Sequence, residues 1–153
     1  MDDLEIRLAR DGELGTVAGL RWRWVAEQGD PGPLDRAEFV TRFVAWAREH
    51  SASHRCYVVL RAGRVLGMAW LALLPRVPTP RALDRRSGDV QCVYVVPEER
   101  DNGVGGRLLD VVLGEARALG LERVTVHSSE RAVPAYLRHG FAPSPRLLQT
   151  RPG

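Results

Sequence analysis

The sequence predicts an α+β fold: a single domain spanning residues 1–153, with a mixed central β-sheet flanked by helices in the order βααβββαβα. The chain is long enough, and at 44% apolar residues hydrophobic enough, to bury one core without disulfides or a metal. Short β-rich runs and longer runs of helical periodicity follow one another with no internal repeat or linker. Residues 89–127 form a strand–helix–strand pattern, which predicts one right-handed crossover between parallel strands.

The first third of the chain predicts a strand and two helices. Residues 5–9 alternate charged and apolar side chains, which is typical of a short strand. Asp11 precedes a first helical pattern, and the glycines and prolines of residues 29–33 end it. Asp35 is the predicted N-cap of a second helix that ends near His50.

The middle of the chain predicts an antiparallel hairpin and a long loop. Residues 56–60 and 65–74 are β-rich and flank a tight turn at Ala62-Gly63. Residues 75–88 are rich in proline and arginine and lack periodicity, so we expect a surface loop there.

The last third predicts alternating strands and helices. A strand over residues 89–96 leads into a helix over 103–119, followed by a strand over 123–127 and a short helix over 129–139. Residues 147–150 are the candidate for a final edge strand.

Composition excludes several kinds of chemistry. All 22 basic residues are arginine, so the chain has no lysine to anchor phosphate in a Walker motif or to form a Schiff base. The two cysteines, Cys56 and Cys92, form no CxxC motif and fit a reducing compartment. The longest apolar run, residues 65–74, is about half the ~20 residues of a membrane helix. With no signal-like start, we expect a cytoplasmic protein that does not contact membranes.

A glycine-rich segment, residues 97–107, lies between a predicted strand and its helix. Such a junction aims free backbone N–H groups and the positive end of the helix at one point, so it predicts a pyrophosphate site. A dinucleotide-binding fingerprint would need a third glycine where Leu108 stands, and a P-loop would need Gly-Lys-Ser/Thr. Neither of these two nucleotide motifs is present.

The segment Arg100-x-x-Gly103-x-Gly105 resembles the (Q/R)xxGx(G/A) motif of the GCN5-related N-acetyltransferase (GNAT) family. As in that family, a strand ending Val-x-Pro precedes the motif, and a tyrosine, Tyr136, stands four residues before a Gly-Phe pair. The resemblance implies a GNAT fold, acetyl-coenzyme A as co-substrate, no metal, and transfer of the acetyl group to a primary amine of a small molecule or peptide.

The resemblance also implies a mechanism and a set of site residues. The amine attacks the thioester directly through a tetrahedral intermediate, Tyr136 protonates the departing thiolate, and Asp89 occupies the position of a general base. The implied cofactor-binding residues are Val93, Tyr94, Val95, Arg100, Asp101, Asn102, Gly103, Val104, Gly105, Gly106 and Ser129. Ser129 stands where family members carry an asparagine; its side chain can still form a hydrogen bond but is shorter, so this sequence departs from the family at one expected cofactor contact.

Each catalytic assignment has a structural alternative. Tyr136 could be an aromatic cap on the core, and Asp89 could be a solvated strand end, with water relaying the proton. His50 and His54 are one helical turn apart, but their place at a helix end favours solvent-facing side chains over a zinc site.

Two other functions remain open at this point: a non-catalytic acyl-CoA-binding or sensory domain, and a tRNA-acetylating toxin. The second would need clustered basic residues, which only residues 75–88 offer, so a nucleic-acid partner is not expected. The resemblance allows a homodimer. The sequence does not identify the amine.

Overall fold

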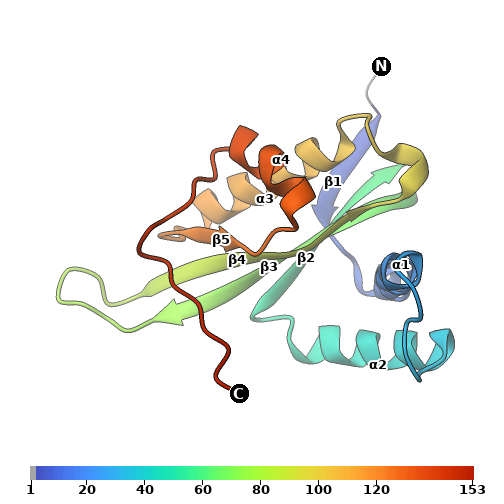
Figure 1. The fold of residues 1–153 in the computed structure, drawn as a ribbon, viewed down its shortest axis with the longest axis horizontal. Coiled ribbons are helices and arrows are strands. Elements are labelled where there is room, and N and C mark those ends of the chain that lie inside the picture. The colour runs from blue at the N-terminus through green and yellow to red at the C-terminus, as the bar shows by residue number, and fades with distance from the viewer. Residues whose placement is uncertain (1–2) are drawn as a thin grey trace.

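The computed structural model describes residues 3–153 as a five-stranded mixed sheet with helices on both faces (Figure 1). The strands are β1 Leu4–Leu8, β2 His54–Arg61, β3 Arg64–Arg76, β4 Arg85–Val95 and β5 Val124–Val126, and the helices are α1 Leu14–Glu27, α2 Arg36–Glu49, α3 Val104–Ala118 and α4 Val133–Arg138. Strands β1 to β4 are antiparallel neighbours in sequence order, and β5 pairs with β4 in parallel. The predicted fold class and element order are confirmed.

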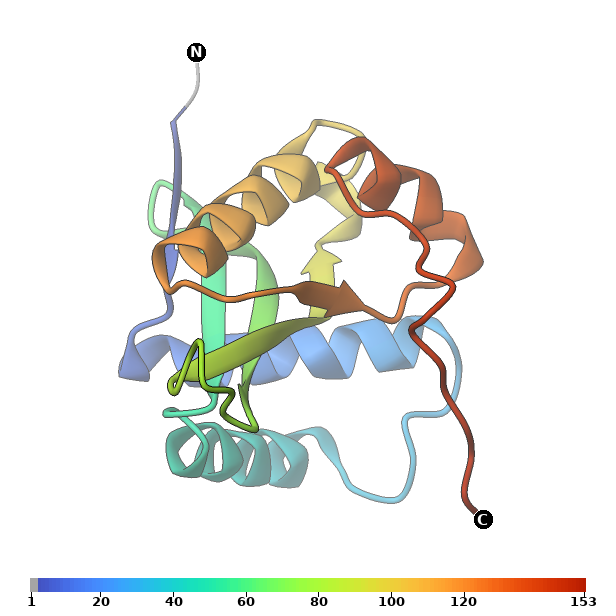
Figure 2. The same ribbon diagram turned by 90° about the vertical axis from the view of Figure 1, so that its left-hand side faces the viewer.

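The helices form two layers. Helices α1 and α2 lie on one face of the sheet and α3 and α4 on the other, as the two views show (Figures 1 and 2). Side chains of β2 and β3 fill the core between the layers, and Tyr57, Val58 and Leu71 are fully buried. Helix α3 covers its face with Leu108 and Val112, which are also fully buried. The sheet is therefore covered on both faces.

The predicted loop over residues 75–88 is wrong at both ends, because β3 and β4 continue as a two-stranded ribbon that projects from the sheet (Figure 1). Pro75 pairs with Arg86 within this ribbon. The backbone N–H of Leu73 donates to the carbonyl of Ser53, on the side of β3 that faces β2. Backbone nitrogens two residues apart in a strand face the same side, so the nitrogen of Pro75 also faces that side, where β2 has already ended. A proline there removes no ladder bond, which is why it does not end the strand.

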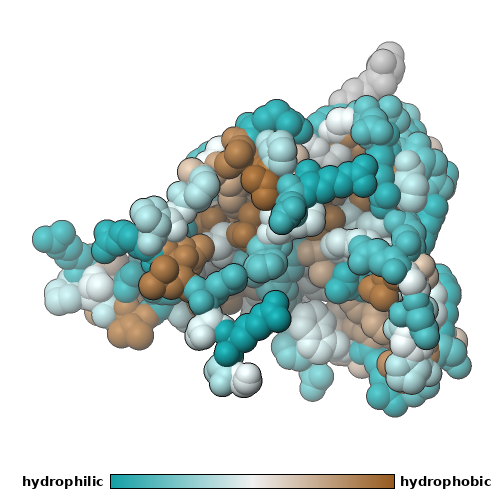
Figure 3. All heavy atoms as spheres, in the orientation of Figure 1, coloured by the Kyte–Doolittle hydropathy of each residue, from teal (hydrophilic) through white to brown (hydrophobic). Residues whose placement is uncertain are grey.

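The predicted edge strand over residues 147–150 is also wrong. This segment is irregular chain, and the backbone bond that it makes is local, from Leu147 N–H to Ser144 O. A strand also needs a neighbouring strand to pair with, whatever its own sequence. The neighbour available at this edge of the sheet would be β5, which has only three residues. The ribbon and this segment both carry exposed apolar side chains, and Figure 3 shows apolar side chains on the surface on the ribbon side of the molecule: Leu74, Val77 and Leu83 belong to the ribbon and the loop at its tip, and Leu147 and Leu148 to the C-terminal segment.

An ion pair ties β1 to the start of α1. The two terminal guanidinium nitrogens of Arg7 donate to the Glu13 carboxylate at 2.8 Å, and the backbone N–H of Arg10 donates to the same carboxylate at 2.7 Å. These bonds lower the pKa of Glu13 to about 2, the hydrogen bond from Arg7 contributing most. The predicted cap Asp11 lies instead in a 3₁₀ turn, Asp11–Glu13, and pairs with Arg48.

We expect Glu13→Gln to lower Tm at neutral pH by about 3–6 °C. Because the folded pKa lies below the ordinary value of 4.5, the stabilisation is complete above pH 4.5 and disappears as the pH falls through about 2. Thermal unfolding between pH 2 and 7 should therefore show the wild type converging on the variant at acid pH. Glu38→Gln, which removes an exposed pair with Arg42, is the control, and equal Tm losses in both variants would contradict the prediction.

Candidate functional site

Strands β4 and β5 separate after three paired residues. Their parallel register runs from Gly88 opposite Val124 to Val90 opposite Val126, where β5 ends. Strand β4 continues through residues 91–95, and within the described part of the chain no strand pairs with that side of it. Figure 2 shows the end of β4 (yellow) and β5 (brown) pointing in different directions. The result is a wedge-shaped opening in the sheet with an unpaired backbone edge.

A β-bulge lies inside this opening. Trp70 of β3 faces Gln91 and Met68 faces Tyr94, so Cys92 and Val93 together oppose one residue of β3. Cys92 has a φ of 55°, a left-handed conformation that is uncommon for a side-chain-bearing residue. The bulge re-aims the strand at the point where β5 leaves it.

Backbone polarity along β4 is set by its bonds to β3. The N–H of Val96 donates to Leu66 O of β3 at 2.9 Å, so the N–H of the residue before it, Val95, points to the open side. The carbonyl of Val95 accepts a hydrogen bond from Nε of Arg100 at 2.8 Å, which fixes that stretch of backbone. A donor is thereby held at the opening.

The loop after β4 leads directly to the start of α3. Residues Pro97–Glu99 form a 3₁₀ turn, and Asp101 and Gly103 take left-handed φ angles of 70° and 76°. Gly103 is the N-cap of α3 and provides no side-chain cap. The first-turn N–H groups therefore have no intrahelical acceptor, and they form a positive end suited to an anion.

Two glycines of the first turn of α3 have different surroundings. A Cβ on Gly105 would meet only Cγ2 of Val95, at 3.7 Å, so this residue is open to an incoming group and lies next to the end of β4. A Cβ on Gly106 would lie 3.3 Å from the ring of His139, so Gly106 allows α3 and α4 to pack closely. The predicted pyrophosphate role fits Gly105 better than Gly106.

Arg100 is turned away from the start of α3. Its guanidinium lies 5.1 Å from the centre of the Tyr94 ring and donates to Glu27 at 3.2 Å, in addition to its bond to Val95. The Tyr94 hydroxyl donates to the same carboxylate. Sequence analysis missed Glu27, the last residue of α1, because nothing in its local pattern separates it from a solvent-exposed glutamate.

These contacts shift two pKa values in opposite directions. Burial and the bond to Glu27 raise the pKa of Tyr94 to about 12, so its hydroxyl remains a donor. The bond from Tyr94, and then that from Arg100, lower the pKa of Glu27. Glu27, Tyr94 and Arg100 therefore form a charged cluster, the Glu27 brace, which links α1 to the end of β4 and the loop before α3.

Asp89 lies at the closed end of the opening. Its two carboxylate oxygens accept from Thr125 Oγ1 at 2.7 Å and from Gln91 Nε2 at 3.0 Å. Asp89 and Thr125 are paired in register one row before the two strands part. The side chain is thus held in place by its neighbours on both strands.

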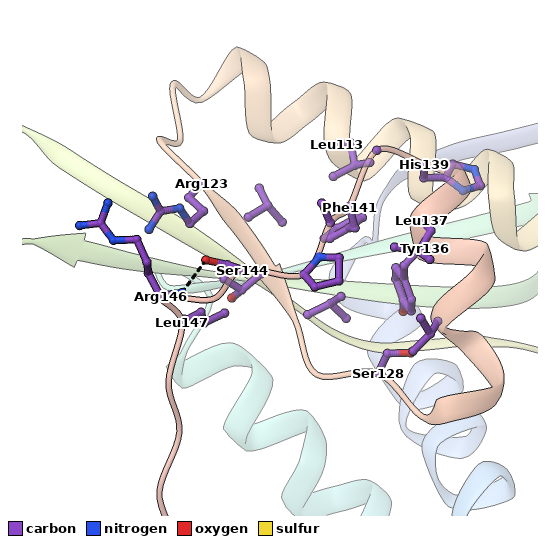
Figure 4. Close-up of a pocket in the computed structure, with 17 residues that line it drawn as sticks. Leu113, Arg123, Ser128, Tyr136, Leu137, His139, Phe141, Ser144, Arg146 and Leu147 are labelled. Carbon is purple, nitrogen blue, oxygen red and sulfur yellow. Dashed lines mark hydrogen bonds between the residues drawn. The ribbon is translucent and has the colours of Figure 1, made fainter.

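Tyr136 projects from α4 toward β5, near Ser128 (Figure 4). Its ring packs edge-on against Phe141 at 5.3 Å, and burial raises the pKa of its hydroxyl. Within residues 3–153 no side chain or backbone group bonds to this hydroxyl. A half-buried phenol of this kind stays protonated at neutral pH and can donate a proton or a hydrogen bond.

Ser129 has a local structural role. Its hydroxyl oxygen accepts from the N–H of Ala132 at 3.3 Å and caps the 3₁₀ turn Glu130–Ala132 that precedes α4. The side chain is exposed, and nothing in its present position points it at the opening.

A hollow of about 820 Å³ lies along β5, and Tyr136 lines it. In Figure 4 Tyr136 and Ser128 lie at one end of it and Arg123 and Arg146 at the other. No residue of the loop before α3 lines it. The hollow is therefore bounded by α4 and the C-terminal segment, and it is distinct from the α3 anion site.

The described residues, 3–153, contain no group of three or more His, Cys, Asp or Glu side chains that could hold a metal ion. In the same part of the chain, no helix combines the length and apolarity that crossing a membrane requires.

Known proteins share this arrangement at low sequence identity. Glucosamine 6-phosphate N-acetyltransferase from Trypanosoma brucei brucei is 24% identical over 147 residues, which cover 96% of this chain and 95% of that enzyme. An amino-acid acetyltransferase from Pseudomonas syringae is 36% identical over 87 residues, and this match spans 57% of the chain but only 18% of the enzyme.

Solved structures agree on the fold. A predicted acetyltransferase from Clostridium acetobutylicum, whose crystal structure was determined with acetyl-CoA, superimposes with a TM-score of 0.78 at 18% identity, over 97% of this chain and 96% of that one. Glucosamine-6-phosphate N-acetyltransferase from Arabidopsis thaliana gives a TM-score of 0.72 at 14% identity, over 99% and 100% of the two chains. The model of the Acetyltransferase (GNAT) family matches residues 19–141. The chain therefore belongs to the GNAT family of acetyltransferases.

Proposed function

We propose that this protein transfers the acetyl group of acetyl-coenzyme A to a primary amine by direct attack. The observation that carries the proposal is the closeness of Gly105 to Val95: a Cβ placed on Gly105 would lie 3.7 Å from Cγ2 of Val95, so the anion-binding start of α3 lies next to the unpaired edge of β4. A thioester carrying a pyrophosphate needs both features side by side. Incubation with acetyl-coenzyme A and a panel of amines, with release of coenzyme A as the readout, tests the proposal. Binding of acetyl-coenzyme A without release on any amine would favour a sensory domain.

The cofactor-binding residues divide into two groups in this proposal. The loop and first turn of α3, residues 101–106, supply backbone N–H groups to the pyrophosphate. The open edge of β4, residues 93–95, pairs with the pantetheine amides as an added strand would. The N–H of Val95 is the donor that stabilises the negative oxygen of the tetrahedral intermediate. In this proposal Arg100 does not contact the phosphate; its role is to hold the backbone of Val95 through the hydrogen bond to the Val95 carbonyl.

The chemical step then balances as follows. The lone pair of the neutral amine forms the C–N bond at the thioester carbon, and the C–S bond breaks as the intermediate collapses. The proton lost by the amine passes to Asp89, directly or through water. The departing thiolate receives the Tyr136 proton, which burial keeps on the phenol at neutral pH.

We expect Asp89→Asn to change the acid limb of kcat/KM. A base is needed where the amine must be deprotonated, so the variant should lose activity most at low pH, by roughly 10-fold or more, with unchanged affinity for acetyl-coenzyme A. Initial rates between pH 5.5 and 9.5 measure this. Asp84→Asn, an exposed change on the ribbon, is the control. A pH profile that does not move would assign the proton transfer to water and leave Asp89 a role in joining β4 to β5.

A further inference from the structure

Arg21 occupies a position on α1 that an apolar residue would normally fill. It lies one turn from Val17 and Ala18, which are fully buried against the sheet, and one turn before Trp24, which packs on the core. The guanidinium is therefore carried on the face of α1 that looks at the sheet, and the side chain is partly buried there. Most of the other arginines of the chain stand on exposed positions or pair with a carboxylate.

Arg21 has no anionic partner within residues 3–153. Its neighbours Arg23 and Arg100 both pair with Glu27, at 3.7 and 3.2 Å, whereas the Arg21 guanidinium lies over the Trp24 ring, 4.9 Å from its centre, and makes no ion pair with any residue of 3–153. A partly buried cation without a counter-charge loses hydration without full compensation. The folded helix tolerates such a cation, but binding of an anion to the guanidinium would be favourable.

One set of ring contacts and one electrostatic effect locate this guanidinium relative to β4. The Trp24 ring, over which the Arg21 guanidinium lies, stacks on the Tyr94 ring with 5.5 Å between ring centres. The guanidinium and the Trp24 ring therefore lie over the end of β4. The charge of Arg21 is also felt at Cys92, where it opposes the rise in thiol pKa that burial causes. Arg21 therefore faces the bulge at the opening from the α1 side, whereas the anion-binding start of α3 belongs to the helix layer on the other face (Figure 1).

We infer that Arg21 binds an anionic oxygen group of the amine substrate, so that the acceptors are small primary amines carrying a carboxylate or a phosphate. The inference rests on the proposed function and names the substrate class for the same site. A planar guanidinium matches either group with two parallel hydrogen bonds, and the Trp24 ring, 4.9 Å from the guanidinium carbon, supports it from one side. An amine tethered to that anion would reach the thioester at the bulge with a fixed orientation.

Matched substrate pairs test the inference. L-methionine against L-methioninamide isolates a carboxylate, and glucosamine 6-phosphate against glucosamine isolates a phosphate. The wild type should use the anionic member of at least one pair with the lower KM. Arg21→Gln should raise that KM about 10-fold or more, with little change for the neutral member and unchanged affinity for acetyl-coenzyme A. Arg21→Lys keeps the positive charge but lacks the paired donors of a guanidinium. Its KM for the anionic member should therefore lie between those of the wild type and Arg21→Gln.

Arg42→Gln is the matched control, since it removes one exposed arginine from α2 and should leave every KM within about 2-fold. Equal loss of kcat on both members of a pair would overturn the inference by placing Arg21 at the reacting carbonyl. No preference for either anionic amine in the wild type would overturn it as well.

Calorimetry separates this inference from the proposed function. The four amines are titrated into the wild type and Arg21→Gln in the presence of coenzyme A. Arg21-dependent binding of an anionic amine without turnover would support the inference while the transferase proposal fails. Turnover of neutral amines alone would overturn the inference while that proposal stands.

Discussion

Gly105→Val should reduce the affinity for coenzyme A by at least ~100-fold, about 2.7 kcal/mol, while the protein remains folded. The pyrophosphate must approach the backbone of the first turn of α3, and a branched side chain at Gly105 would fill that space. Within the protein itself there is room, because the added Cβ would meet only Cγ2 of Val95, at 3.7 Å. The expected loss therefore falls on binding and not on the fold. Calorimetric titration with coenzyme A measures it, and the far-ultraviolet circular dichroism and Tm check folding.

Gly114→Val provides the control for this experiment. It makes the same change nine residues later in the same helix, where an added Cβ would have nothing within 4 Å. Both variants carry the same modest cost of a β-branched residue in a helix. If Gly105→Val binds coenzyme A as tightly as Gly114→Val does, the pyrophosphate lies elsewhere and the assignment to the start of α3 is wrong.

The order of the elements could be predicted because most of them have local signals. Asp35 caps α2 by accepting the N–H of Glu38 at 2.8 Å, as its position in the sequence suggests. The helix that becomes α3 ends at Gly120, which takes a φ of 72°. Each signal acts within a few residues, so no knowledge of the tertiary structure is needed.

The extent of the strands could not be predicted, because it depends on distant partners. Proline and arginine made residues 75–88 look like a loop, but the free edge beyond β2 lets Pro75 stay in a strand. Residues 147–150 show the converse, with a strand-like sequence and no ladder. Pairing is a property of the neighbouring chain, and local pattern does not contain it.

Much of the candidate site was visible as a motif, but its geometry was not. The glycines before α3 and Tyr136 can be recognised by spacing, and the structure places both on the α3 and α4 layer. The bulge at Cys92 and the Glu27 brace have no sequence signal, since each depends on residues from two or three elements. Arg21 could have been noticed as a charge among apolar helix positions, although only the fold shows that it faces the sheet without a partner.

Tyr136→Phe should lower kcat by ~10²-fold with the KM for acetyl-coenzyme A nearly unchanged. The substitution keeps the ring and its edge-on contact with Phe141 at 5.3 Å, so only the hydroxyl is removed. Because burial raises the pKa of Tyr136 above its usual value, the phenol is protonated throughout the neutral range, and any loss of wild-type kcat caused by its ionisation should appear only at alkaline pH. The variant should lack that alkaline limb.

Tyr57→Phe is the control for loss of a phenol, since the Tyr57 hydroxyl accepts from Arg55 at 3.0 Å and its ring packs in the core away from the opening. It should reduce stability somewhat and leave kcat within about 3-fold. Rapid-quench measurement of the first turnover shows whether the chemical step limits the rate in each variant. If it does, and Tyr136→Phe still retains kcat within a factor of about 3 of the wild type, the thiolate takes its proton from water, and Tyr136 serves only to pack α4 against Phe141.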